Sequence, residues 1–383
     1  MYHIIFNGNE KYIPYICVCM TSIVRNTDEN VSYKERGRTV LCAGNADEAY
    51  EEAYCFHILT DFLSEETIQK IHELEKQLKE IYPVSVELHF LDDRLFLDFP
   101  RWRKSFSAYY RIMAAQFLPL NVRRAVYLDG DTLVNTDIRA FMVQDLGGKT
   151  LAAVPNFPQL KHRLKNVPKE GEGEYSFERH FCYFNSGVML IDMENWRKEN
   201  IQEKVMRFLN AYQVLCPDQD ALNAVFKDEV KILPYRWNLM WHNTVSPEKI
   251  KKKWNEQPEA FADEGFYDGL DSPEIIHYSV KPWDSDGFRV ADDYTFFYYP
   301  NLGLWWDMAK EVPVFAEELL AIRQSGPYRK MSANNKRKKF LLQFAWYRSL
   351  LKLKRDSRPF IRKIEKPFKK IRDIFYKYKR RKG

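Results

Sequence analysis

The chain has 383 residues, 45% of them apolar and 15% aromatic, and a net charge of +6. This length suffices for one large domain or two ordinary ones with a sizeable core, and the composition excludes a disordered chain. The charge is uneven, because residues 336–382 hold 20 Lys/Arg against three acids, a local charge of +17 that leaves −11 for the rest. We therefore expect an acidic body and a basic tail with separate roles.

The cysteines and the N-terminal residues indicate in which cellular compartment the protein works. Six cysteines are scattered and none forms a CxxC pair, which argues against a structural zinc site. Sparse thiols are typical of a reducing compartment. The N-terminus lacks the basic leader of a signal peptide, and residues 12–24 are too few and too mixed to cross a bilayer. These features predict a cytoplasmic catalytic body.

The first 330 residues alternate strand-like and helix-like segments. Apolar strands are predicted at 3–7, 54–60, 84–91 and 125–128. Helices are predicted at 14–25, after the N-cap residue Ser64, and at 109–118, where Pro119 ends the last one. This alternation predicts an α/β fold with a mostly parallel sheet.

One stretch interrupts this alternation. Residues 26–53 are polar, charged and without clear periodicity. They are predicted to form a surface insertion, for which a position over the substrate cleft is one alternative.

The strongest local signal is the segment Tyr-Leu-Asp-Gly-Asp-Thr-Leu at 127–133. Asp129 and Asp131 follow an apolar strand, and alternate residues of an extended chain point the same way. Open α/β sheets bind ligands at the carboxyl ends of their strands, so the two carboxylates could share one divalent cation. Mn²⁺ and Mg²⁺ prefer such oxygen ligands and bridge diphosphates well.

Three interpretations of this motif remain open. It could be a solvated turn, the nucleophile motif of a haloacid dehalogenase-type phosphohydrolase, or the metal–diphosphate site of a nucleotide-sugar transferase. The position of Gly130 between the acids, and the place of the motif in mid-chain, argue against the phosphohydrolase.

Four later segments decide among these interpretations. They are YFNSGVMLID at 183–192, PDQDALN at 217–223, LPYRWN at 233–238 and IHYSVKPW at 276–283. Together with the Asp-Gly-Asp segment they resemble, in order and spacing, glycosyltransferase family 8, over roughly residues 3–310. That family includes the retaining galactosyl- and glucosyltransferases of bacterial lipopolysaccharide synthesis, and glycogenin. The resemblance implies a GT-A-like α/β fold, with a Rossmann-type mixed sheet flanked by helices, over residues 1–330.

The resemblance also implies a metal and diphosphate site. His277 would be the third protein ligand beside Asp129 and Asp131, and this nitrogen favours Mn²⁺, with Mg²⁺ as the alternative. Lys281 would place a point charge on the donor diphosphate, and Gly130 of the Asp-Gly-Asp segment would be a further donor-binding residue. Cation and lysine together would neutralise the departing UDP.

A sugar pocket follows from the same resemblance. Asn185 and Gly187 would line it, and Asp218 would accept hydrogen bonds from sugar hydroxyls. Gln219 would lie on the face from which a nucleophile attacks, but an amide is a poor nucleophile. We therefore expect same-face departure and attack, with retained anomeric configuration. Arg111 matches the family's arginine near the donor sugar, and its alternative is a surface ion pair.

The N-terminal segment at 6–12 resembles the family's base-binding loop, with Asn7, Asn9 and Tyr12 as donor-binding residues. Asn9 stands where the family usually has an aspartate, and its amide oxygen could still accept a hydrogen bond from uracil. Asn156 and the short interval between residues 277 and 281 are two further departures from the family pattern. They leave the identity of the donor sugar open.

The tail, residues 331–383, mixes bases with aromatic and aliphatic residues. Five apolar residues between 361 and 375 recur at three- and four-residue steps, as on one face of a helix: Ile361, Ile364, Phe368, Ile371 and Phe375. This pattern predicts a membrane-surface anchor, peripheral on the inner face of the cytoplasmic membrane. Nucleic-acid binding and docking on another protein are the alternatives, but no other segment of the chain suggests recognition of nucleotide bases.

These observations predict a hexosyltransferase that moves galactose or glucose from a UDP-sugar donor to a glycan or lipid-linked oligosaccharide acceptor. Cell-surface polysaccharide or lipopolysaccharide synthesis is the expected setting. A metal-dependent phosphohydrolase and a non-catalytic nucleotide-sugar-binding homologue are the two alternatives.

Overall fold

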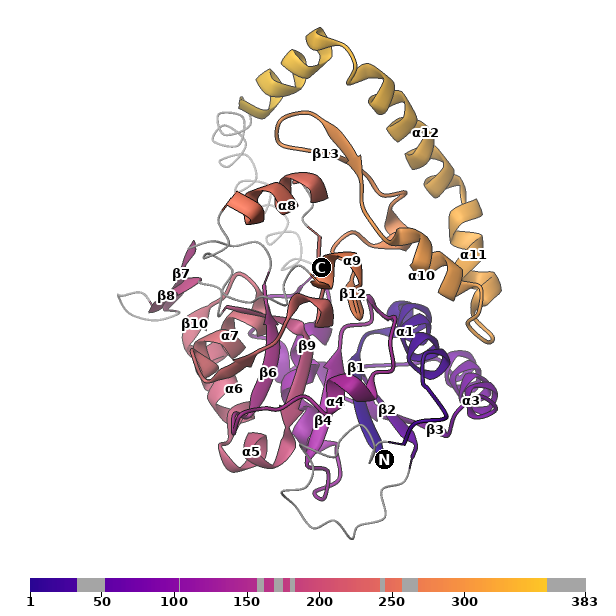
Figure 1. Cartoon of the computed structure of the whole chain (residues 1–383). Helices are drawn as coiled ribbons and strands as arrows, with labels where there is room; N and C mark the ends of the chain where they lie inside the picture. Colours follow the sequence, from indigo (N-terminus) through magenta and orange to yellow (C-terminus); the bar gives the residue numbers. More distant parts are fainter. Residues whose placement is uncertain are drawn as a thin grey trace, which may run out of the picture.

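A computed structural model describes residues 1–32, 52–102, 104–156, 162–168, 175–179, 183–241, 245–256 and 268–356. Its centre is a seven-stranded sheet with strand order β11-β6-β9-β4-β1-β2-β3 (Figure 1). The strands are β1 (Tyr2–Asn7), β2 (Tyr54–Thr60), β3 (Val84–Phe90), β4 (Arg124–Leu128), β6 (Leu151–Pro155), β9 (Phe184–Asp192) and β11 (Val230–Ile232). Six run parallel, and β9 runs antiparallel between β4 and β6. The predicted mixed, mostly parallel α/β sheet is confirmed.

Helices cover both faces of this sheet, which is why most residues of its central strands are buried and apolar. In β1, Tyr2, Ile4 and Phe6 face a core shared with α1 (Ile13–Arg25) and α3 (Glu65–Lys79). Ile5 faces the opposite core, shared with the 3-10 helix η3 (Ser107–Gln116) and with α5 (Met193–Lys198), α6 (Ile201–Ala211) and α7 (Pro217–Phe226).

Two predicted helices illustrate how local sequence sets these elements. Ser64 caps α3, and its side chain accepts a hydrogen bond from the backbone N–H of Thr67 at 3.2 Å, as expected for an N-cap. The segment predicted as a helix at 109–118 is a 3-10 helix that begins at Ser107 and ends at Gln116. Arg111, in the middle of this helix, is buried.

A segment after β9 completes the edge of the sheet at which Asp129 and Asp131 lie. The short strand β12 (Ile275–His277) pairs antiparallel with β5 (Thr132–Val134), which follows β4 directly. The remaining described elements are η1 (Glu10–Tyr12), η2 (Asp93–Phe96), α4 (Arg139–Met142), β7 (His162–Pro168), β8 (Tyr175–Arg179), β10 (Tyr212–Gln213), η4 (Tyr235–Trp237), α8 (Pro247–Glu256), α9 (Asp268–Asp271), η7 (Pro282–Asp284), β13 (Phe288–Val290), β14 (Phe296–Tyr298), α10 (Leu302–Ala309), α11 (Ala316–Gln324) and α12 (Gly326–Leu341).

The predicted insertion at 26–53 is described only at its two ends, and residues 33–51 lie outside the described part of the chain. Arg139 contacts both ends, since its guanidinium donates to the carbonyl of Asp28 at 2.6 Å and lies 3.2 Å from Glu52. It also lies over the ring of Tyr82, which precedes β3. Both ends therefore lie where the parallel strands begin, at the edge opposite Asp129.

The boundary predicted at residue 330 falls inside α12. Residues 345–356 are again helical, and Figure 1 shows this C-terminal part arching above the β13–β14 hairpin. Asn335 donates to Asp286 at 2.7 Å, and the ammonium of Lys339 lies over the rings of Phe296 and Tyr298. The apolar series at 361–375 lies outside the described residues. Among those described, no helix is both long and apolar enough to traverse a bilayer.

Candidate functional site

The Asp-Gly-Asp segment leaves the carboxyl end of β4 in a turn held by its neighbours. The N–H of Asp129 donates to the carbonyl of Gly187 on β9 at 2.7 Å, and the hydroxyl of Thr132 donates to the carbonyl of Asp129 at 2.8 Å. The carbonyl of Asp131 accepts from the N–H of Tyr278 at 2.9 Å. These bonds fix both carboxylates between β9 and β12, as expected for a ligand site at the strand ends.

His277 completes a group of three possible metal ligands. The pairing of β12 with β5 places it opposite Thr132. Its Nε2 lies 3.1 Å from Oδ1 of Asp131 and 3.7 Å from Oδ2 of Asp129. Oδ1 of Asp131 is buried and has no hydrogen-bond partner among the described residues. Two hard oxygens and one imidazole nitrogen around a common point suit a divalent cation, and the three ligand atoms lie within 4.8 Å of one another.

Gly187 leaves the room that this group needs. A Cβ at this position would lie 2.4 Å from Cε1 of His277 and 2.6 Å from Oδ2 of Asp129. Any side chain here would push the ligands apart, so the structural reason for glycine is close approach of the ligand side chains.

Asn238 fixes the orientation of His277. Nδ1 of His277 lies 3.1 Å from Oδ1 of Asn238, which can accept its hydrogen. The proton on Nδ1 leaves the lone pair of Nε2 facing the two aspartates, as a metal ligand requires. Burial holds the pKa of His277 below its ordinary value, although Asp129 opposes this effect, so the imidazole is neutral.

Arg111 is buried between two carboxylates and is not the surface ion pair that was its alternative. Its side chain is 6% exposed, and it lies 2.8 Å from Asp129 and 3.2 Å from Asp218. Burial alone would raise the pKa of Asp129, but the charge of Arg111 and the hydrogen bond from Tyr127 hold it below its usual value. Burial raises the pKa of Asp218 in spite of the same arginine.

Lys281 and Tyr12 both contact Asp131. The Lys281 ammonium pairs with Oδ2 and also donates to the carbonyl of Tyr278 at 2.7 Å. The Tyr12 hydroxyl donates to Oδ2 at 3.1 Å, and its ring meets those of Tyr15 and Trp283 edge-on. A cationic side chain thus lies beside the candidate cation position despite the short interval after His277.

The expected sugar-pocket residues form one polar network beside this site. Oε1 of Gln219 accepts from Nδ2 of Asn185 at 3.0 Å and from the N–H of Ser186 at 3.2 Å. Oδ2 of Asp218 accepts from the Ser186 hydroxyl at 2.7 Å. Asn185 also donates to Asn156 at 3.3 Å. The structure therefore brings Asp218, Gln219, Asn185 and Gly187 together from α7 and β9.

Asp220, which follows these residues, binds backbone groups outside the expected sugar pocket. It accepts the backbone N–H groups of Leu215 and Cys216, both at 3.0 Å, in front of α7. Its other oxygen accepts from the hydroxyl of Tyr183 at 2.6 Å, so Asp220 also links α7 to the residue that precedes β9.

The residues predicted to hold the base lie around the start of α1. The Asn7 amide donates to the carbonyl of Ser107, and a Cβ at Gly130 would lie 3.1 Å from the Tyr12 ring. The amide oxygens of Asn7 and Asn9 are buried and have no hydrogen-bond partner in the described part of the chain. Acceptors of this kind are what recognition of a uracil N–H would use.

Sequence reasoning missed two residues of the site. Asn238 lies in a segment that carried the family resemblance but received no role. Tyr127 was assigned only to the strand, yet its hydroxyl donates to Oδ1 of Asp129 at 2.7 Å. Its place two residues before Asp129, on the same side of an extended chain, was the available signal.

Comparisons with known proteins agree with this geometry. The family model Glycosyl transferase family 8 matches residues 3–287. General stress protein A of Bacillus subtilis is 34% identical over 211 residues, which cover 52% of this chain and 66% of that protein. A lipopolysaccharide 1,2-glucosyltransferase of Escherichia coli is 26% identical over 288 residues, covering 73% of this chain and 77% of that enzyme.

Solved structures share the fold. An active-site mutant of LgtC matches with a TM-score of 0.55 at 20% identity, over 84% of this chain and 99% of that one. The bifunctional glycosyltransferase WbbM matches with a TM-score of 0.57 at 19% identity, over 85% of this chain and 52% of that one. The predicted GT-A-like fold is confirmed, and such family members typically use a divalent metal, for which this chain has an Asp-Asp-His group. The chain belongs to glycosyl transferase family 8.

Proposed function

We propose that the chain is a Mn²⁺-dependent, retaining hexosyltransferase that moves galactose or glucose from a UDP-sugar to a glycan or glycolipid acceptor. The observation that carries the proposal is the convergence of Asp129, Asp131 and His277 at the carboxyl end of β4, where Oδ1 of Asp131 has no hydrogen-bond partner in the described part of the chain. When bound there, a divalent cation supplies a Lewis acid that offsets charge on a diphosphate. The nitrogen ligand favours Mn²⁺ over Mg²⁺.

Lys281 would stabilise the same leaving group. Its ammonium already lies beside Asp131, so it can contribute a positive charge next to the diphosphate without a large movement. A preorganised charge in a buried site stabilises a departing anion more than a solvated one does. Asn9, with its buried amide oxygen, would accept from the uracil ring.

The network around Gln219 supports same-face substitution. The carboxylate of Asp218 is engaged by Arg111 and Ser186, so it can hold sugar hydroxyls but is a poor nucleophile. Gln219 is an amide fixed by Asn185 and Ser186. The acceptor hydroxyl would therefore attack the face from which UDP leaves, and a donor phosphate oxygen would take its proton.

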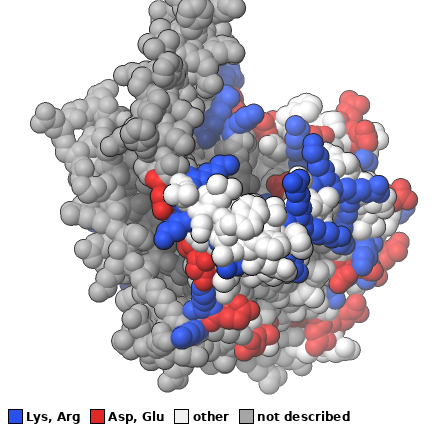
Figure 2. All heavy atoms as spheres, turned by 90° about the horizontal axis from the view of Figure 1, so that it is seen from above, with Lys and Arg blue, Asp and Glu red and all other residues white. Residues whose placement is uncertain are grey.

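A lipid-linked acceptor fits the C-terminal part of the chain. The last described residues expose large apolar side chains among lysines and arginines: Phe340, Phe344, Trp346, Leu350 and Leu353. Seen from above, both Lys/Arg and Asp/Glu side chains border an uncharged surface (Figure 2). Residues 357–383 add 12 Lys/Arg against two acids. We propose that this tail holds the enzyme on the anionic inner face of the cytoplasmic membrane.

A panel of nucleotide sugars with Mn²⁺ tests the proposal, with slow donor hydrolysis as the readout. Hydrolysis needs no acceptor, so it identifies the donor first. We expect UDP-galactose or UDP-glucose to release UDP, and Asp131→Asn to abolish this release. Free phosphate as the product would support a phosphohydrolase instead. Mn²⁺-dependent UDP binding without any UDP release would support a non-catalytic homologue.

A further inference from the structure

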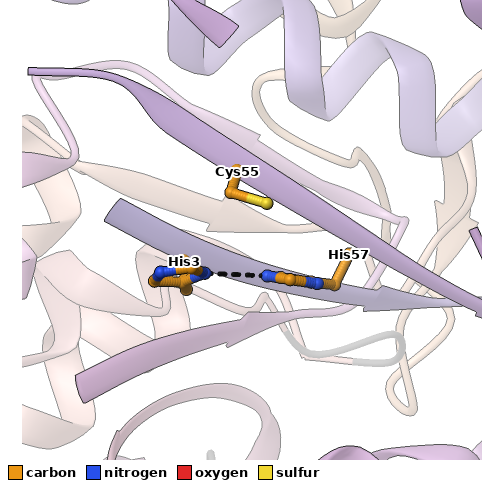
Figure 3. A group of neighbouring side chains, drawn as sticks. All are labelled: His3, Cys55 and His57. Carbon is orange, nitrogen blue, oxygen red and sulfur yellow. Dashed lines mark hydrogen bonds between the residues drawn. The ribbon is translucent and has the colours of Figure 1, made fainter. Parts of the chain in front are cut away.

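A second group of possible metal ligands lies on the other half of the sheet. His57 lies on β2, two strands from β4, and Glu87 and His89 lie on the neighbouring strand β3. His3 on β1 continues the row. In Figure 3 the rings of His3 and His57 face each other end to end, with Cys55 beside them. The parallel register aligns these residues on the face that also carries the end of η3, where Phe117 lies against His89.

The distances among three of these residues fit one small cation. Nδ1 of His57 lies 2.9 Å from Nε2 of His89 and 3.3 Å from Oε2 of Glu87. Nε2 of His89 lies 3.7 Å from Oε2 of Glu87. Two ligands of a tetrahedral zinc ion, each about 2.0–2.1 Å from the metal, lie about 3.3 Å apart. All three ligand atoms already lie near that separation.

The hydrogen-bond geometry of the histidines fits the same arrangement. His57 is fully buried, and its two ring nitrogens face His89 on one side and His3 on the other. If Nδ1 binds a metal, the hydrogen is on Nε2, which lies 2.9 Å from Nδ1 of His3. Nδ1 of His3 can accept that hydrogen bond. Such a second partner fixes the tautomer and orientation of a ligating histidine.

We propose that His57, Glu87 and His89 form a Zn²⁺ site separate from the Asp129–Asp131–His277 group. Two imidazoles and one carboxylate are ligands that zinc prefers, and the scattered cysteines argue only against a site built from thiolates. The Glu87 side chain is 48% exposed and that of His89 14%, so an ion can enter and a water can take the fourth position. Cys55 is the weaker candidate ligand, because its thiol groups with His3 and His57 and not with Glu87 and His89.

Co²⁺, which replaces zinc and absorbs visible light when tetrahedral, tests this site in the full-length protein. Mn²⁺ and UDP are first added to fill the donor site. We expect about one equivalent of Co²⁺ to give a tetrahedral absorption band, and Zn²⁺ to displace it and raise the melting temperature. His89→Gln and Glu87→Gln should remove the band, and His3→Gln should weaken binding about 10- to 100-fold.

Two controls separate the site from the donor site and from surface binding. His72→Gln changes an exposed histidine on α3 and should leave the band intact. Asp131→Asn, which disrupts the donor site, should leave it intact as well. Circular dichroism of each variant shows whether it is folded. A band that survives in folded His89→Gln and Glu87→Gln, or that disappears in Asp131→Asn, would overturn the proposal, and so would the lack of any band in the unmodified protein.

Discussion

A single amide decides which nitrogen of His277 faces the candidate cation. Oδ1 of Asn238 lies 3.1 Å from Nδ1 of His277, while Nδ2 of Asn238 donates to Asn185 at 2.9 Å. Asn238 therefore links the metal ligand to the predicted sugar pocket. Because Asn238 is 2% exposed, water cannot replace it easily.

Asn238→Ala should lower Mn²⁺ affinity about 10- to 100-fold, since partners that orient a ligating histidine contribute on that scale. Isothermal titration with Mn²⁺ in the presence of UDP measures this change. Asn121→Ala, at an exposed position before β4, is the matched control and should bind Mn²⁺ as the unmodified chain does. Equal affinity in both variants would show that Asn238 does not orient the ligand.

Arg111 is the counterion of two acids, so its loss should affect folding as well as catalysis. Arg111→Met leaves Asp129 and Asp218 without their shared cation. Removing one partner of a buried ion pair costs about 3–5 kcal/mol. Urea unfolding measures the loss. Arg123→Met, where the side chain is 75% exposed, should change stability by less than about 0.5 kcal/mol, and an equally small effect at Arg111 would contradict this role.

At the scale of elements, β9 serves as a wall of the site. It pairs with β4 and β6 on its two sides, so its backbone has little freedom to move away from the ligands. The ligands His277 and Asp129 come from β12 and the end of β4, and they meet over Gly187. Because these segments approach so closely, the geometry of the Asp129–Asp131–His277 group depends on the absence of even a methyl group at Gly187.

Gly187→Ala should therefore weaken Mn²⁺ and UDP binding at least tenfold, because the new Cβ would lie 2.4 Å from His277. Titration calorimetry checks the affinity. Gly303→Ala in α10 is the control, since a Cβ there meets nothing within 4 Å, and it should bind normally. If Gly187→Ala bound Mn²⁺ and UDP as tightly as the unmodified chain, then His277 and Asp129 would not meet over β9 when the ligands bind.

The sequence predicted those elements whose signals are local. The strands β1, β2 and β4 and the Ser64 cap follow from short apolar runs and one capping residue, and Asp129 follows directly from its strand. His277 could be placed only through the family resemblance, because it comes from a segment almost 150 residues later. The contact of Asn238 with His277, and the row of His3, His57 and His89, depend on strand register and on distant loops. Neither can be read from periodicity.

At the scale of the molecule, the chain combines an acidic body with a basic C-terminal part. The described portion of that part packs on the β13–β14 hairpin through Asn335 and Lys339, and the Tyr328 hydroxyl donates to the carbonyl of Ser285 at 3.1 Å. A shorter chain that keeps these contacts should end after residue 356.

Removing residues 357–383 deletes 12 Lys/Arg and should abolish flotation with anionic vesicles at physiological salt, because each base near such a surface contributes about 1 kcal/mol. Donor hydrolysis should be unchanged, since every residue proposed to hold the donor or the cation lies before residue 282. Neutral vesicles serve as the control for the full chain. Equal flotation of the two chains, or no flotation of either, would reject the membrane role of this segment.

The account depends most on the cation between Asp129, Asp131 and His277. The most direct measurement is a crystal structure with Mn²⁺ and UDP, in which anomalous scattering locates manganese. We predict one manganese peak in direct contact with these three side chains and with the UDP diphosphate, and Lys281 beside the same diphosphate. A peak elsewhere, or a bound UDP whose diphosphate lies away from the two aspartates, would contradict the account.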